Sequence, residues 1–261
     1  MFGWRISGKE FAICGCAVGK QRDSRYACAT MNSRAFSAVA IFAWAWLGTD
    51  VSRGGESSFV ALFPKDGMPE GWVVRRWDDV SKPADTNAVW RVENGVLHGS
   101  NPRGTWLMSE KEYGDFALEF EFKLGETGNS GCALRAPLRG DPAFDGMELQ
   151  MADVRYNPQA TTAELTGGLY RAVAPTRQVY RPTEWNRYEI KLMATRLKVV
   201  LNGETIQDLN LEEQDRPVKR HDGTQAPPIK DRPRRGHIGF QELSRGGTHT
   251  QIRNARIQVL D

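Results

Sequence analysis

Acidic and amide side chains are concentrated in the nine residues from Asp145 to Asp153, and their spacing suits a site that moves protons. If this segment is extended, successive side chains point to opposite faces, so Glu148 and Gln150 share one face. The other face carries only apolar residues, namely Met147, Leu149 and Met151. In an antiparallel sheet with one packed side the apolar row enters the core, which leaves Glu148 and Gln150 on an open face beside Asp153 at the end of the strand.

The preceding segment, which runs from Asn129 to Arg135, supplies a positively charged side chain. Its alternation puts Arg135 on the face opposite Cys132. If the two segments pair as strands, the Arg135 guanidinium reaches the face of Glu148 and completes a carboxylate site with a positive charge. A simpler interpretation stays open, in which Glu148 is a solvated strand residue and Asp153 caps a turn.

Familiar catalytic patterns of other kinds are absent from the sequence. It contains no phosphate-binding glycine loop, no Gly-x-Ser-x-Gly elbow, no dinucleotide fingerprint and no His-x-x-x-His zinc spacing. The four histidines are scattered, and only His98 and His237 fall in or near expected strands, either at a site or simply at the surface. We therefore expect no cofactor and no motif-based metal site, with a divalent cation left as an open alternative.

The elements that would hold these residues are short strands. Residues 115–124 alternate five apolar side chains with charged or small ones, as in a strand with one buried face. Asn94-Gly95 and Asn202-Gly203 lie between apolar runs and predict two tight hairpins. About a dozen such strands, turning every 8–12 residues, predict an all-β fold with two antiparallel sheets forming a β-sandwich over residues 58–261.

One long segment interrupts this pattern between residues 210 and 235. It is rich in proline and charge and ends in the basic cluster Arg232-Pro233-Arg234-Arg235. Such a charge run usually belongs to a solvated insertion, which is the interpretation we favour. A ligand-binding role for the basic cluster is the alternative.

The balance of charge argues against a nucleic-acid partner. Removing the seven basic and four acidic residues of 1–57 from totals of 35 and 32 leaves 28 of each in residues 58–261. The folded part is formally neutral, so it has no overall positive field that would attract phosphates.

The first 57 residues have the composition expected of a leader sequence. A short basic start from Met31 is followed by thirteen mostly apolar residues, 35–47, a length that suits a signal peptide better than a stable membrane span. We expect a leader over residues 1–57, with the signal peptide at 31–50, and export to the periplasm or the medium. An uncleaved anchor is the alternative, because no clear Ala-x-Ala cleavage site follows.

The positions of the cysteines agree with a division into a leader and a folded domain. Cys14, Cys16 and Cys28 lie in the leader, and Cys132 is the single cysteine of residues 58–261. The mature domain therefore has no internal disulfide, and Cys132 is expected to be a small core residue.

Read in order, the motifs resemble the 3-keto-disaccharide hydrolase family, long known as a domain of unknown function. The matching pieces are Leu62-Phe63, Asp66-Gly67, Gly71-Trp72, residues 90–97, residues 111–116, Asn129-Ser130-Gly131 with Arg135, residues 148–153, Thr166-Gly167 with Tyr170, Glu184-Trp185-Asn186, Asn202-Gly203, Gly239-Phe240-Gln241 and residues 253–257. Each motif is loose, but the ordered set is specific and covers nearly all of 59–261.

The resemblance implies a concanavalin A-like jelly roll in an exported protein that acts on glycosides with a ketone at C3. It implies that Glu148 is a catalytic base or acid, that Asp153 is its partner, and that Arg135 stabilises the enolate. Substrate hydroxyls are expected to bind to Gln150, Tyr170, Gln241 and Asn129. One departure is Leu243, since members often have histidine two positions after the glutamine of the closing strand.

Two other functions are compatible with the residues. The same sandwich supports a non-catalytic carbohydrate-binding module, which Leu243 favours. A laminarinase-like retaining glucanase has a similar acidic strand, but it would need a glutamate where Asp153 stands, with the two carboxyls about 5–5.5 Å apart. The sequence fixes neither the sugar and linkage nor the oligomeric state.

Overall fold

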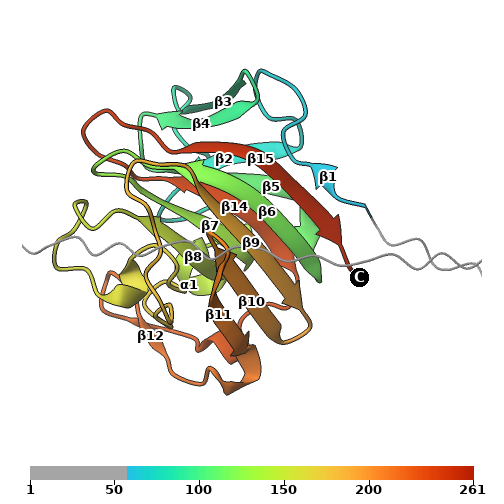
Figure 1. The fold of residues 1–261 in the computed structure, drawn as a ribbon, viewed down its shortest axis with the longest axis vertical. Coiled ribbons are helices and arrows are strands. Elements are labelled where there is room, and N and C mark those ends of the chain that lie inside the picture. The colour runs from blue at the N-terminus through green and yellow to red at the C-terminus, as the bar shows by residue number, and fades with distance from the viewer. Residues whose placement is uncertain (1–57) are drawn as a thin grey trace, which may run out of the picture. The chain divides into compact units, whose positions relative to one another are not determined.

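The structure, a computed structural model, describes residues 58–261. The expected leader at 1–57, its signal peptide at 31–50 and the cysteines Cys14, Cys16 and Cys28 lie outside the described residues. Within 58–261 nearly every element is a strand, and the strands form two main antiparallel sheets (Figure 1). In that part of the chain no helix has the length and apolar character needed to cross a membrane.

The larger sheet has eight strands in the order β11-β10-β9-β6-β15-β4-β3, and β1 pairs with β15. Its members are β1 (Val60–Ala61), β3 (Val89–Glu93), β4 (Val96–Asn101), β6 (Phe116–Lys123), β9 (Asn186–Met193), β10 (Arg196–Leu201), β11 (Glu204–Asn210) and β15 (Gln251–Val259). The predicted hairpins join β3 to β4 and β10 to β11. At both turns Asn and Gly have positive φ, which is 52° and 74° at Asn94 and Gly95 and is the geometry that a two-residue hairpin turn needs.

The smaller sheet has five strands in the order β2-β5-β14-β7-β8. Its members are β2 (Trp72–Arg76), β5 (Thr105–Tyr113), β7 (Asn129–Ala136), β8 (Met147–Ala152) and β14 (Gly236–Glu242). The remaining elements are the helix α1 (Pro142–Asp145), the two-stranded β12 (Val218–Lys219) and β13 (Gln225–Ala226), and short 3-10 helices at Thr162–Glu164, Leu211–Glu213 and Ile229–Asp231.

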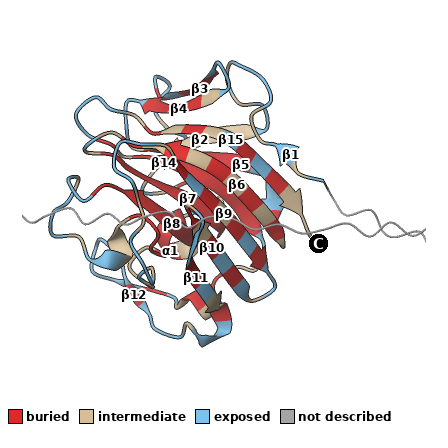
Figure 2. Cartoon of the chain, in the orientation of Figure 1, coloured by how far each residue is buried: buried red, intermediate tan, exposed pale blue. Residues whose placement is uncertain are grey.

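The core lies between the two sheets, as the alternation of β6 predicts. Phe116, Leu118, Phe120 and Phe122 are buried, whereas the residues between them are partly exposed (Figure 2). Phe120 packs edge-on against Phe240 of the smaller sheet, with their ring centroids 5.2 Å apart. Each such buried side chain stabilises the fold by roughly 1.5–3 kcal/mol. The predicted antiparallel two-sheet sandwich is therefore confirmed.

Strand β8 is buried on both faces. Met147, Leu149 and Met151 enter the main core, and Cys132 of the neighbouring strand does the same as a free thiol. The alternate residues Glu148 and Gln150 face away from that core, yet they are buried too (Figure 2). The face that carries them is covered by loops instead of being open to water.

The segment 210–235 is a packed structure in part, so the prediction of a solvated insertion is corrected. Val218 and Ala226 of its small hairpin pack against Ala143 and Phe144 around helix α1. Arg232 is only 4% exposed and donates hydrogen bonds to the backbone oxygen of Ala143, within α1, at 3.1 Å and to that of Gly146, at the end of α1, at 2.8 Å. Its buried guanidinium fastens the segment to the β7–β8 connection.

Candidate functional site

A cavity of about 470 Å³ lies on the face of the smaller sheet that points away from the core. Four residues of the sheet and its strand ends line it, namely Asn129, Glu148, Gln150 and Gln241. Connecting segments supply the walls, among them Trp77, Arg103, Asp141, Tyr170, His221 and Leu243. This volume is within the usual range for a small-molecule site.

The pairing of β7 with β8 creates room for the Glu148 carboxyl. Ala133 lies opposite Glu148 and Gly131 lies opposite Gln150 in the antiparallel register. A Cβ atom on Gly131 would collide with Oε1 of Glu148, so the side chain of Glu148 leans over the glycine of the neighbouring strand. A glycine here serves the site because a larger residue would occupy the space of the carboxyl.

We expect Gly131→Ala to lower kcat by about tenfold to a hundredfold, because the added Cβ would collide with Oε1 of Glu148 and must push the carboxyl aside. The backbone of Gly131 is not in the left-handed region, and the colliding atom ends a side chain, so the fold should lose only about 1 kcal/mol. Steady-state kinetics and thermal melting measure the two effects. An unchanged kcat would show that the position of this carboxyl does not matter to turnover.

Glu148 has an unusual electrostatic environment. The residue is 3% exposed, and its Oε1 has no hydrogen-bond partner among the described residues. Burial raises the pKa of this carboxyl well above its usual range, and the charge of Asp141 adds to the effect. The surroundings of Glu148 therefore favour the protonated form of its carboxyl, and the unpaired oxygen is suited to a ligand.

Asp141 is a second carboxyl in the cavity, and sequence reasoning missed it. It is the N-cap of α1, where its Oδ1 accepts a hydrogen bond from the backbone N–H of Ala143 at 3.0 Å. Burial raises the pKa of Asp141 to about 7. The only sequence signal is an aspartate before Pro142, which is typical of a helix start, but a helix of four residues has no periodicity to reveal it.

The four residues predicted to bind substrate all line the cavity. The side chain of Gln150 is fixed by a hydrogen bond in which its Oε1 accepts from the backbone N–H of Met151 at 2.8 Å. Asn129 has a buried Oδ1 that has no hydrogen-bond partner among the described residues. Gln241 lies on the same sheet face, and Tyr170 enters from the segment after β8. Their amide and phenol groups can exchange hydrogen bonds with hydroxyls.

Asp153 is near this cavity but is engaged elsewhere. It lies in an adjoining recess of about 40 Å³, where Arg155 donates to both of its oxygens at 2.7 and 2.8 Å. Burial opposes ionisation, yet the hydrogen bonds from Arg155 hold the pKa of Asp153 below its usual range. The structure therefore shows a carboxylate in an ion pair at the position predicted for the partner of Glu148.

The prediction that Arg135 shares the face of Glu148 is wrong. The strand has an irregularity there, since β14 pairs with Ala133 and Ala136 across a register shift and Arg135 has a φ of 50°. The side chain turns to the other side and donates to Gly114 O, Ala194 O and Asp115 Oδ1 at 2.7–2.9 Å. Its guanidinium is buried between the β5–β6 turn and the β9–β10 turn and does not line the cavity.

An imidazole enters the cavity from an unexpected place. His221, in the turn between β12 and β13, has its ring centroid 5.3 Å from Phe144 and 5.8 Å from Tyr170. Burial lowers its pKa, so the ring is neutral at physiological pH. His98 and His237 do not line the cavity, whereas Leu243 does. Sequence reasoning missed His221 because it lies in the segment interpreted as solvated.

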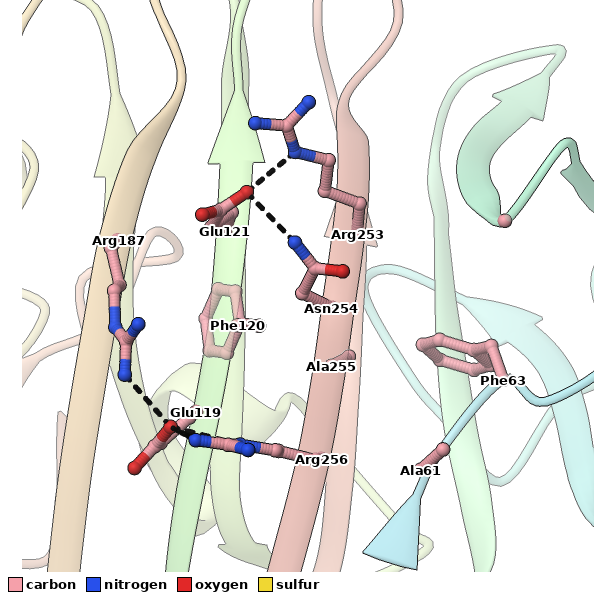
Figure 3. A pocket seen from close by; sticks show the side chains of 11 residues that line it. Ala61, Phe63, Glu119, Phe120, Glu121, Arg187, Arg253, Asn254, Ala255 and Arg256 are labelled. Atoms are coloured by element: carbon pink, nitrogen blue, oxygen red, sulfur yellow. Dashed lines mark hydrogen bonds and ion pairs between the residues drawn. The ribbon is translucent and has the colours of Figure 1, made fainter.

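A second hollow, of about 490 Å³, lies on the outer face of the larger sheet (Figure 3). Its charged groups are paired with one another. Arg187 and Arg256 both pair with Glu119, and Arg253 pairs with Glu121. Because these charges are already satisfied and partly exposed, we take the cavity around Glu148 as the candidate site. Across residues 58–261, no three His, Cys, Asp or Glu side chains are arranged to hold a metal ion.

Comparisons with known proteins identify the family of the chain and agree with its fold. A family model described as the 3-keto-alpha-glucoside-1,2-lyase-like domain matches residues 58–258. A crystal structure from Parabacteroides distasonis ATCC 8503, named "Putative glycosyl hydrolase", shares 24% identity and a TM-score of 0.63, covering 78% of this chain and 100% of that one. A second structure of the same name and source shares 25% identity and a TM-score of 0.60, covering 78% and 94%. Among curated proteins no match was found.

Proposed function

Because the chain belongs to the 3-keto-alpha-glucoside-1,2-lyase-like domain family, we propose that it cleaves glycosides whose C3 hydroxyl has been oxidised to a ketone. It is a carbohydrate-active protein, and the finer assignment to 3-keto substrates is our proposal. The observation that carries it is the buried Glu148 carboxyl, with an unpaired oxygen in a cavity lined by hydrogen-bonding amides. Such a group suits proton transfer to or from a bound sugar.

The chemistry of a 3-keto-glycoside fits these residues. The ketone acidifies the proton on C2, so a base can remove it and the group at C1 can leave with a proton from an acid. Water then adds to the resulting double bond, and the sum is hydrolysis. Glu148 takes part in these proton transfers, and Gln150, Gln241, Asn129 and Tyr170 bind the ring hydroxyls and the ketone.

A positive group near the developing enolate oxygen would assist this reaction. Arg135 is excluded from the role by its position. Arg103 lines the cavity and donates from its guanidinium to the hydroxyl of Tyr156 at 3.0 Å. We assign the enolate-stabilising role to Arg103 for this reason.

The test uses matched glycosides that differ only at C3, one as ketone and one as alcohol. We expect release of the aglycone from the 3-keto compound and none from the alcohol. Tight binding without release would favour a carbohydrate-binding module, for which Leu243 in the cavity is the supporting observation. Equal cleavage of both compounds would overturn the proposal in favour of an ordinary glycosidase, although the ion pair of Asp153 with Arg155 leaves that reaction without the expected second carboxyl.

A further inference from the structure

Two carboxyl groups reach one cavity from adjoining parts of the chain. Glu148 comes from strand β8, and Asp141 comes from the β7–β8 connection, where α1 lies beside β8 (Figure 1). We propose that Asp141 is the second acid–base group of this site, taking the C2 proton of the sugar while Glu148 donates a proton to the leaving oxygen at C1. The proposal rests on the proposed function and adds a residue and a division of roles to it.

The surroundings of Glu148 suit the acid. Among the described residues, no cation and no hydrogen-bond donor pairs with Oε1 of Glu148. The residue is also almost wholly buried. A buried carboxyl without compensation favours its neutral form. The charge that acts on it is that of Asp141, which disfavours a second negative charge in the same cavity. Glu148 therefore presents a proton when the substrate arrives.

The surroundings of Asp141 suit the base. The backbone N–H of Ala143 donates to its Oδ1, and a hydrogen bond of this kind stabilises the carboxylate form. The charged groups that act on it are of both signs, with Asp145 and Asp78 opposed by Arg220. Arg220 is fixed by its ion pair with Asp145, at 2.6 Å. The pKa of about 7 leaves a large share of Asp141 ionised at neutral pH.

The proton balance closes with water as the only reactant besides the glycoside. Asp141 takes the proton from C2, and the C2–H electron pair forms the C1=C2 bond as the C1–O bond breaks. The leaving oxygen takes the proton of Glu148. In the second half, the Glu148 carboxylate accepts a proton from water as the water oxygen bonds to C1, and Asp141 returns its proton to C2. Both carboxyls then have their starting protonation states.

The test separates the two roles by isotope exchange. In D₂O the wild-type protein should exchange the C2 hydrogen of a 3-keto-1,5-anhydro sugar, which has no leaving group, and NMR follows the exchange. We expect Asp141→Asn to slow this exchange by about 10²-fold or more and Glu148→Gln to retain most of it. Asparagine caps a helix as well as aspartate does, so this variant should keep α1. Asp208→Asn, in an exposed ion pair of β11, is the matched control.

A second readout needs no substrate. Carboxyl ¹³C titration should show that the pKa of Glu148 falls in Asp141→Asn, because the Glu148 carboxyl loses a negative neighbour. Asp141→Ser, which also caps helices, replaces the asparagine variant if that protein does not fold.

The outcomes separate this inference from the proposed function. Wild-type protein that neither exchanges nor cleaves 3-keto compounds would overturn the proposed function, and the two assigned roles with it. Wild-type activity together with undiminished exchange in Asp141→Asn would overturn only the role of Asp141. An unshifted titration of Glu148 in Asp141→Asn would show that the charge of Asp141 does not act on Glu148.

Discussion

Glu148→Gln is expected to lower kcat by about 10²–10⁴-fold on a 3-keto-glycoside whose leaving group is another sugar. The substitution keeps the size of the side chain and removes the proton that the leaving oxygen needs. Since Gln still fills the space over Gly131, KM should change little. Initial rates measured over a range of substrate concentrations separate the two constants.

The leaving group supplies the control for this variant. A 4-nitrophenolate leaves without a proton, so the loss of kcat in Glu148→Gln should be much smaller on the 4-nitrophenyl 3-keto-glycoside. A rise in KM with nearly unchanged kcat would instead mark Glu148 as a binding contact. Unaltered turnover on both substrates would contradict any catalytic role and return the protein to the binding-module hypothesis.

The same variant should change the pH dependence of stability. Burial raises the pKa of Glu148, so the native state holds this proton more tightly than the unfolded chain does. That stabilising contribution is complete below about pH 4.3, the ordinary glutamate value, and is lost as the pH rises toward the raised pKa. The Tm of Glu148→Gln relative to the wild type should therefore increase between pH 4 and pH 8 in melting experiments.

Arg135→Met is expected to lower the free energy of unfolding by about 3 kcal/mol while leaving kcat per folded molecule unchanged. The guanidinium is 1% exposed and joins Gly114, Asp115 and Ala194, and methionine preserves its length without its donors. Two carbonyls and a carboxylate then lose their partner. Denaturant unfolding and kinetics on the same preparation measure both quantities.

The matched control for Arg135→Met is Arg196→Met. Arg196 pairs with Asp208 on the surface, where its side chain is 62% exposed, so its removal should change stability little. A selective fall in kcat for Arg135→Met, without a fall in stability, would restore the enolate role that the family resemblance implied.

The sequence predictions that the structure confirms relied on a regular alternation of apolar and polar residues. Strands β6 and β8 both follow period-two patterns, and a strand converts such a pattern directly into two faces. That rule placed Phe120 in the core and Glu148 and Gln150 on the opposite face. The hairpin turns were equally local, since two residues with positive φ are enough to define each one.

The errors arose where a face depends on distant parts of the chain. The irregularity at Arg135 depends on its pairing with β14, about a hundred residues later, and one extra residue in a strand reverses the face of the next side chain. His221 and Asp141 reach the cavity through packing between the small hairpin and α1. Neither contact has a spacing signal in the sequence. The ion pair of Asp153 is local, but it depends on an Arg155 rotamer that the sequence does not specify.

The anchoring of the hairpin by Arg232 bears on how this protein could diversify. The acid on β8 is built into the sandwich, whereas His221 belongs to a hairpin that is attached beside α1 through a few contacts. Changes in the hairpin's tip alter the cavity wall and leave the sheet intact. Laboratory evolution toward new aglycones should therefore accumulate its beneficial substitutions around residues 220–224, with the acidic strand left unchanged.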